Sequence, residues 1–391
     1  MSQQNIFDNT EIAFALKSDS ELGRAYFLFK MISKPTLVRI GSSLTSFALN
    51  ARLPVEGLIK VTVFNHFCGG VNEADCESVI DKMYSKGVSS VLDFSVEGKE
   101  TEAYFDAAKD KIIEIIHFTD EKEAIPIVVF KPTGFGRFAL YQKKGEGRLF
   151  TEKEQEEWNR IVARFDVVCK LAKEKGVEVL IDAEESWMQD AADELVEDMM
   201  RKYNTDTVVV YNTLQTYRWD RLDFLKASHK RAKAEGFNLG MKIVRGAYME
   251  KERDRAEEKD YKSPICESKV ITDENFNACL KYILSNLDDI SIFIGTHNED
   301  STYIALKMMK DLNIAINDTR VWFGQLFGMS DHISFNLSEL GYNVAKYLPF
   351  GPVKDVMPYL IRRAEENTSV AGQTGRELAL IKKELERRKL D

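Results

Sequence analysis

No apolar run in the 391-residue chain reaches the roughly 20 residues that a membrane-spanning helix needs. The five cysteines are scattered without CxxC spacing, which indicates neither a disulfide framework nor a zinc site. With five histidines, a metal site built from Asp182, Glu184 and His297 would be poor in nitrogen ligands, so we expect no metal. The first residues lack the basic start and apolar core of a secretory signal. These absences predict a cytoplasmic protein.

Basic residues are fewer than acidic residues, 54 against 63. The net charge of −9 argues against a nucleic-acid binder, which would need a basic face. Between Glu21 and Glu56, however, no acidic residue occurs, and the segment carries several cations among apolar residues. One interpretation is a helical arm on an acidic body. The other is a surface that touches anionic lipid, with the protein peripheral on the inner face of the membrane.

Short apolar runs rich in β-branched residues recur through the rest of the chain. Each is followed by a charged amphipathic stretch with helical spacing, and two of these stretches end in glycine. The runs lie near 89–97, 125–131, 177–183, 206–212, 239–247, 290–296, 319–327 and 343–350. Eight alternations over roughly 250 residues predict an α/β protein with a (βα)8 TIM-like barrel, and an open doubly wound sheet is the alternative.

The barrel prediction implies a division of the chain. We expect an N-terminal helical arm over 1–85, the catalytic barrel over 86–370, and a solvated helical tail over 371–391. No segment is left for a second catalytic domain or a DNA-binding module, so a bifunctional enzyme is not expected.

Functional groups of a barrel enzyme lie at the carboxyl ends of its strands and in the loops that follow. Basic, acidic and amide side chains occupy those positions here, which predicts a polar mouth for an anionic cofactor and a small charged substrate. They are Asp93, Glu97, Lys131, Asp182, Glu184, Glu185, Gln215, Lys242, Arg245, Thr296, His297, Gln325 and Tyr347. Any one of them could equally form a salt bridge within the barrel.

Two features of these strand ends leave alternatives open. Lys131 and Lys242 would also suit a Schiff-base aldolase. The segment YLPFGPVKDVMPYLIRR, residues 347–363, ends in paired arginines that suit a carboxylate or phosphate. Arg362 and Arg363 could instead complement a helix C-terminus with Glu366 one turn on.

With MKIVRGAYMEKERDRA, VLIDAEES, GTHN and YLPFGPVKDVMPYLIRRAEEN in this order, the chain resembles the proline dehydrogenases over roughly residues 85–370. The resemblance is greatest to the mitochondrial-type branch. It implies a (βα)8 barrel that uses FAD to oxidise L-proline to Δ1-pyrroline-5-carboxylate, the first step of proline catabolism to glutamate, with a membrane quinone as electron acceptor. A hydroxyproline-selective flavoenzyme of the same fold and the Schiff-base aldolase are the alternatives.

The resemblance also assigns roles to individual residues. Asp182 and Lys242 belong to the catalytic centre, although bacterial members commonly have arginine at the position of Lys242. The residues implied at the substrate are Lys131, Tyr248, Tyr347, Arg362 and Arg363. Those implied at the FAD are Ala183, Gln215, Arg245, Gly246, Ala247, Thr296, His297 and Glu366.

One geometric expectation follows for the eighth helix. Arg362 lies ten residues after Pro352, which is ~15 Å along a helix. A helix that ran down the outside of the barrel would carry both arginines away from the strand ends. If they bind substrate, the eighth helix must lie over the barrel mouth.

Overall fold

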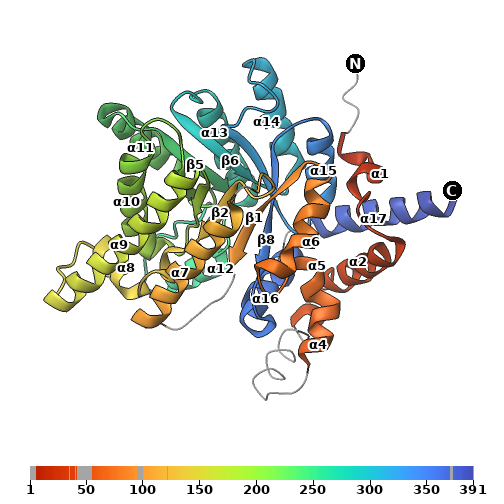
Figure 1. The fold of residues 1–391 in the computed structure, drawn as a ribbon, viewed down its shortest axis with the longest axis horizontal. Helices are drawn as coiled ribbons and strands as arrows, with labels where there is room; N and C mark the ends of the chain where they lie inside the picture. The colour runs from red at the N-terminus through yellow and green to blue at the C-terminus, as the bar shows by residue number, and fades with distance from the viewer. Residues whose placement is uncertain are drawn as a thin grey trace. The chain divides into compact units, whose positions relative to one another are not determined.

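The computed structural model describes residues 6–34, 36–39, 41, 55–94, 100–120, 122–369 and 373–390. Eight strands follow one another in chain order around a closed barrel (Figure 1). They are β1 (Val88–Phe94), β2 (Ile127–Phe130), β3 (Glu178–Ile181), β4 (Val210–Gln215), β5 (Leu239–Val244), β6 (Ile290–Gly295), β7 (Val321–Leu326) and β8 (Val344–Phe350). Helices alternate with the strands, so the predicted (βα)8 barrel is confirmed.

All eight predicted strands exist, but β4 begins later than expected. The Asn204 side chain accepts hydrogen bonds from the backbone N–H groups of Val209 and Val210, both at 2.9 Å. This local capping holds the segment before Val210 outside the ladder. The strand then continues through polar residues to Gln215, because Thr213 donates its hydroxyl to the Ile181 carbonyl at 2.8 Å.

The chain forms two compact units, which we call the terminal unit (Met1–Glu97 and Gln325–Asp391) and the central unit (Gly98–Gly324). Helices of the central unit are α7 (Glu102–Thr119), α8 (Phe138–Gly145), α9 (Glu152–Lys175), α10 (Ser186–Tyr203), α11 (Arg221–Glu235), α12 (Met249–Glu258), α13 (Lys269–Leu284) and α14 (Glu299–Asp311). Helices α9 and α11 end at Gly176 and Gly236, both left-handed, as the sequence predicts.

The terminal unit contains the parallel ladder of β1 with β8. Its helices are α1 (Thr10–Ala13), α2 (Asp19–Ile32), α4 (Glu56–Ile59), the π-helical turn η2 (Lys60–Phe64), α5 (Asn65–Phe67), α6 (Glu73–Tyr84), α15 (Asp331–Glu339), α16 (Val353–Ser369) and α17 (Gln373–Leu390). Helix α15 packs on β8 and β1, and α6 packs on β1. Residues from both ends of the chain therefore build this unit.

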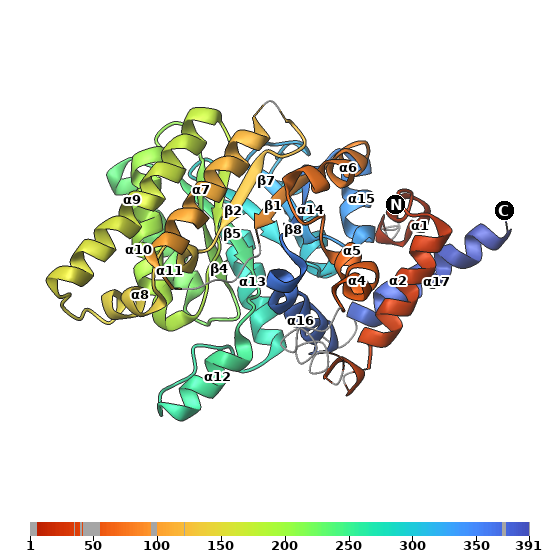
Figure 2. The ribbon, with the colours of Figure 1, turned by 60° about the horizontal axis from the view of Figure 1, so that its bottom comes forward.

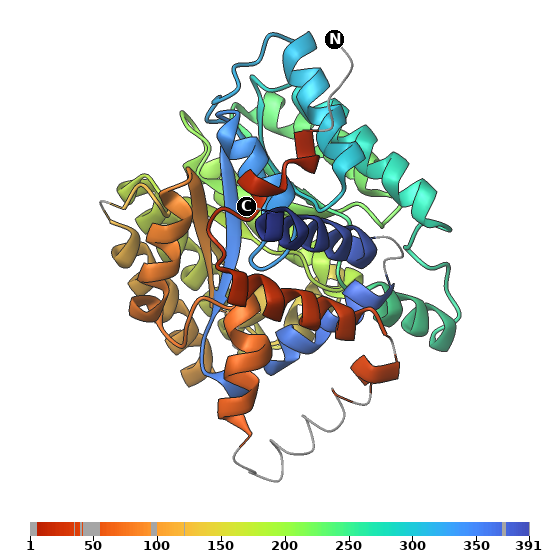
Figure 3. The same cartoon turned by 90° about the vertical axis from the view of Figure 1, so that its right-hand side faces the viewer.

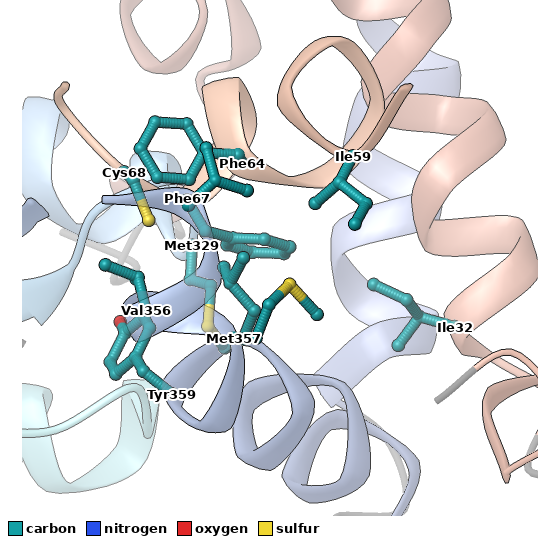
Figure 4. Close-up of a cluster of buried hydrophobic side chains, with 11 residues drawn as sticks. Ile32, Ile59, Phe64, Phe67, Cys68, Met329, Val356, Met357 and Tyr359 are labelled. Atoms are coloured by element: carbon teal, nitrogen blue, oxygen red, sulfur yellow. The ribbon is translucent and has the colours of Figure 1, made fainter. Parts of the chain in front are cut away.

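Helix α16, which carries Arg362 and Arg363, packs against the N-terminal helices α2 and α4, the turn η2, and α17. Its side chains Val356 and Met357 point into a cluster that includes Ile59, Phe64 and Phe67 (Figure 4). Burial of these apolar groups holds α16 on the arm. The placement of α16 over the barrel mouth stays a prediction.

Helix α17 was expected to be solvated, and this expectation is wrong. It packs alongside α2 in the terminal unit, as the dark blue and red helices show (Figures 2 and 3). Leu380 and Ile381 are buried against Phe14, Leu22 and Phe29. The sequence misled because only one face of this highly charged helix is apolar.

Among the described residues, no helix combines the length and apolar character needed to cross a lipid bilayer.

Candidate functional site

The carboxyl edge of the central unit's strands gathers most of the predicted site residues. Parallel ladders join β2 to β3, β3 to β4, β4 to β5, and β5 to β6, so their carboxyl ends lie at one edge. Residues that end a strand or follow it directly are Lys131, Asp182, Ala183, Gln215, Arg245, Gly246, Ala247, Thr296 and His297. We call this group the strand-end site.

Lys242 lies inside β5 instead of at its end, paired in register with Thr213 of β4 and Phe293 of β6. Its ammonium donates a hydrogen bond to Oδ1 of Asp182 and forms an ion pair with it. The lysine side chain is 6% exposed and the aspartate side chain 19%. A buried cation needs such a partner, and the contact places the Lys242 ammonium beside the strand-end residue Asp182.

Gln215 ties together two loops of the strand-end site. Its amide nitrogen donates to the Glu184 carbonyl at 2.6 Å, and its amide oxygen accepts from the Ala247 N–H at 3.2 Å. A single buried side chain thereby holds the loop after β3 against the loop after β5. The backbone around Ala183 and Gly246 is fixed in this way.

The Arg245 guanidinium is held by three partners. It donates to Asp273 at 2.7 Å, to the Thr296 hydroxyl at 2.9 Å and to the Ser301 hydroxyl at 3.1 Å. It also lies over the Phe276 ring, 4.5 Å from the centroid. The planar fork is therefore oriented before any ligand binds, as a cation that recognises an anionic group should be.

Gly246 adopts φ +133°, a conformation that favours glycine. A Cβ at this position would lie 2.6 Å from the Tyr217 ring. Glycine is required here because the Tyr217 ring packs closely against the backbone of Gly246. The expectation that the small backbone serves the approach of a cofactor remains a prediction.

Glu184 follows β3, where the sequence placed it at the polar mouth but not among the substrate or cofactor residues. Its carboxylate accepts from the Thr133 N–H at 3.0 Å and from the Thr133 hydroxyl at 2.7 Å. Burial raises the pKa of Glu184 to about 7, against the opposing effects of the Thr133 hydrogen bonds and the Lys131 charge. Its place after β3 could be read from the sequence, but its burial and its contacts with Thr133 could not.

The loop after β3 is fixed from a third side as well. The Glu184 N–H donates to the Gln189 side chain at 2.8 Å, and Glu252 of α12 accepts from both the N–H and the hydroxyl of Ser186, each at 2.6 Å. Helix α12 lies at the lower edge of Figure 2. Helix α12, whose N-cap is the predicted substrate residue Tyr248, is therefore anchored to α10.

The other predicted residues belong to the terminal unit and are described within it. Tyr347 was expected at the end of its strand but lies in the middle of β8, opposite Val91 of β1. Arg362 and Arg363 are half-buried on α16, and the Arg363 guanidinium lies 5.3 Å from the Tyr359 ring centroid. The side chain of Glu366 lies outside the described residues.

The hydrogen-bond donors in and beside the strand-end site are mostly cationic, which suits a large anionic cofactor. Lys131, Lys242 and Arg245 supply three cations, and Thr296 supplies a hydroxyl. Cations and oriented donors are what a pyrophosphate and an electron-accepting ring need. In the described part of the chain, no group of three His, Cys, Asp or Glu side chains could hold a metal ion.

Comparison with known proteins shows the family to which this chain belongs. The model of the family described as proline dehydrogenase matches residues 76–376. The carbapenem antibiotics biosynthesis protein CarD of Pectobacterium carotovorum subsp. carotovorum is 37% identical over 364 residues, covering 92% of this chain and 94% of CarD. Mitochondrial proline dehydrogenase 1 of Homo sapiens is 42% identical over 242 residues, covering 61% of this chain and 40% of the human protein.

Solved structures agree on the fold. Proline utilization A (PutA) from Bdellovibrio bacteriovorus, inactivated by N-propargylglycine, superposes with a TM-score of 0.70 at 21% identity. The similarity covers 95% of this chain and 37% of PutA. The chain thus spans nearly the whole length of CarD but less than half that of the human protein or of PutA.

Proposed function

Because this chain belongs to the proline dehydrogenase family, we propose that it oxidises L-proline to Δ1-pyrroline-5-carboxylate with FAD as its cofactor. The family match over residues 76–376 carries this proposal, since it spans the whole strand-end site. The buried ion pair of Lys242 with Asp182 supports it, because an oriented ammonium group at the strand ends can stabilise negative charge that develops in such a reaction.

The proposed cofactor residues are those that the resemblance to the family implies. We assign FAD contacts to Ala183, Gln215, Arg245, Gly246, Ala247, Thr296, His297 and Glu366. Bound FAD would supply a two-electron acceptor for the hydride that leaves C5 of proline. Lys242 would stabilise negative charge that develops during the reaction, while Asp182 keeps the lysine positioned.

Substrate binding is assigned to a carboxylate clamp and two rings. Lys131, Arg362 and Arg363 would bind the proline carboxylate, because charge-assisted hydrogen bonds fix both position and orientation. Tyr248 and Tyr347 would pack against the pyrrolidine ring. This clamp would hold C5 in a reactive geometry.

The decisive experiment is the absorption spectrum of the purified protein before and after anaerobic addition of L-proline. We expect flavin bands that bleach with L-proline. A protein that carries no flavin after incubation with FAD, or a flavin that L-proline leaves oxidised, would overturn the proposal. Borohydride trapping of a lysine would instead indicate the aldolase, although a lysine held in an ion pair, as Lys242 is, is a poor nucleophile.

The wider setting of the reaction is also proposed. Electrons would pass to a membrane quinone, and the protein would be cytoplasmic with a peripheral contact on the inner face of the membrane. Charge reversal at Lys34 and Arg39 should then weaken binding to anionic vesicles and turnover with long-chain quinone, while activity with a soluble dye persists. Equal vesicle binding before and after the change would contradict the membrane contact.

The product would enter catabolism to glutamate, as the resemblance implies. The relative CarD is named for carbapenem antibiotics biosynthesis, so a biosynthetic fate of the product is the second candidate. Growth of a deletion strain on proline as nitrogen source would distinguish the two, because only the catabolic role predicts a defect.

A further inference from the structure

A cavity of about 470 Å³ lies within the terminal unit, and none of the residues that line it is assigned to the proposed reaction. The cavity is lined by residues of α1, α2, α6, the segment η2–α5, α15 and β8. Its volume falls in the range of roughly 300–1,000 Å³ that is typical of small-molecule sites. What could occupy it follows from how its charged and apolar groups are distributed.

Two cations that line the cavity, Lys17 and Lys346, share one carboxylate, Asp331. The Lys346 ammonium contacts Asp331 at 2.8 Å and also donates to the carbonyls of Met329 at 2.7 Å and Leu326 at 3.4 Å. Asp331 in turn pairs with Lys17 at 3.1 Å. Burial acts to raise the pKa of Asp331, but Lys17 and Lys346 hold it well below its usual range. The three donors of Lys346 are all used, so this lysine is a structural cation.

Two further cations stand at the exposed rim of the cavity. Arg24 projects from α2 and donates to the Ser20 hydroxyl at 2.7 Å, and Lys82 projects from α6. Glu21 is the acid beside them, 3.7 Å from Lys82, and its carboxylate also caps α2 by accepting from Ser18. Counting side chains that line the cavity, four cations face two carboxylates. The surplus of positive charge favours the binding of an anionic ligand.

The imidazole of His66 does not add to this charge. Burial lowers its pKa to about 3, and its Nε2 lies 3.0 Å from the Gly328 carbonyl oxygen. It is therefore neutral at physiological pH, with the ring oriented by the backbone.

The inner wall of the cavity is apolar. Ala13, Met83 and Phe335 are buried there, and Leu28 and Val79 line the wall nearer the rim. Cations at an exposed rim above an apolar interior match a molecule with an anionic head and an apolar tail. A planar carboxylate suits the guanidinium of Arg24.

We propose that this cavity binds a single-chain amphipathic carboxylate, with its head at Arg24 and Lys82 and its tail against Met83 and Phe335. The proposal is independent of the proposed reaction, because no residue that lines the cavity is among those assigned to proline or FAD. The occupant is a free fatty carboxylate, and the experiment separates it from binding of the protein to an anionic lipid membrane.

The test is the binding of decanoate to the full-length protein, measured by calorimetry below its micelle concentration. Decanoate should bind, whereas acetate and decyltrimethylammonium should not, because the first lacks the tail and the second has the wrong charge. The double substitution Arg24→Gln and Lys82→Gln should weaken decanoate binding roughly ten-fold or more. The matched control, Lys30→Gln with Lys86→Gln, removes the same charge from exposed positions outside the cavity and should leave affinity unchanged.

A second variant tests the tail independently of charge. Val79→Phe should fill the cavity and abolish decanoate binding, and a thermal unfolding curve that matches wild type would show that the fold is kept. Binding of the cationic amphiphile as tightly as decanoate, or equal loss in the control pair, would overturn the proposal. So would binding to phosphatidylglycerol vesicles alone, with no affinity for monomeric decanoate.

Discussion

Two buried lysines on barrel strands differ in how their charge is used. Lys346 on β8 is 1% exposed and its partner Asp331 8%, and two backbone carbonyls complete its hydrogen bonds. Lys242 on β5 is similarly buried at 6%, but its partner Asp182 is 19% exposed, among the groups of the strand-end site. A buried lysine is therefore no sign of function by itself. The exposure of its partner and the polar groups beside it distinguish Lys242, which we propose to be catalytic, from the structural Lys346.

The largest expected effect separates these two lysines by stability. Lys346→Met leaves Asp331 buried with one of its two cations, and breaking such a network costs about 3–5 kcal/mol. We expect the free energy of unfolding, measured by urea titration, to fall by that amount. Lys242→Met should cost less than half as much, because Asp182 can reach solvent, yet it should abolish proline oxidation. Equal losses of stability in the two variants would contradict the distinction between a structural Lys346 and a catalytic Lys242.

The next largest effect concerns substrate affinity, if Arg362 on α16 binds the proline carboxylate as proposed. Arg362→Met removes one charge-assisted contact from the proposed carboxylate clamp, a loss of about 1.5–3 kcal/mol. The KM for L-proline should rise roughly ten-fold or more, while the flavin content of the purified protein stays at the wild-type level. Steady-state kinetics with a soluble dye give the first value and the absorption spectrum the second. An unchanged KM would remove Arg362 from the substrate site.

Glu184 offers a test by pH. Its pKa is raised from 4.5 to about 7, so the folded state holds a proton that the unfolded state has already released between these values. Its contribution to stability is complete below about pH 4.5 and is lost as the pH rises through 7. Glu184→Gln cannot ionise and can still pair with Thr133. The decline in the free energy of unfolding from pH 5 to 8 should therefore be shallower in the variant, and identical slopes would contradict the burial of a titrating carboxyl.

The smallest effect concerns substrate choice. If Tyr347 packs against the pyrrolidine ring, an added hydroxyl is excluded at a cost of roughly 1–3 kcal/mol. L-proline should then be favoured over trans-4-hydroxy-L-proline by roughly ten- to hundred-fold in kcat/KM, and Tyr347→Ser should reduce that preference. A wild-type enzyme that oxidises hydroxyproline equally well or better would favour the hydroxyproline-selective alternative.

The sequence predicted most of the barrel because each strand is a local apolar run and each helix a local amphipathic pattern. It missed the start of β4, since the Asn204 side chain competes for backbone donors, and it placed Tyr347 at a strand end instead of within β8. It could not reveal the ion pair of Lys17 with Asp331, or the packing of α17 on α2. Such contacts join segments more than 300 residues apart, and no local pattern encodes them.

The same limit applies to the candidate site. The strand-end rule found Lys131, Asp182 and Arg245, because it depends only on where strands end. It also placed Glu184 at the strand ends, but neither the burial of this carboxyl nor its contacts with Thr133 can be read from spacing.

The most direct test of the account compares the flavin spectra of wild type, Lys242→Met and Lys346→Met during anaerobic addition of L-proline. The account predicts that the flavin bleaches in wild type and in folded Lys346→Met, and stays oxidised in Lys242→Met. Bleaching of Lys242→Met at the wild-type rate, or a wild-type protein that contains no flavin, would contradict the claim that the strand-end site performs the reaction.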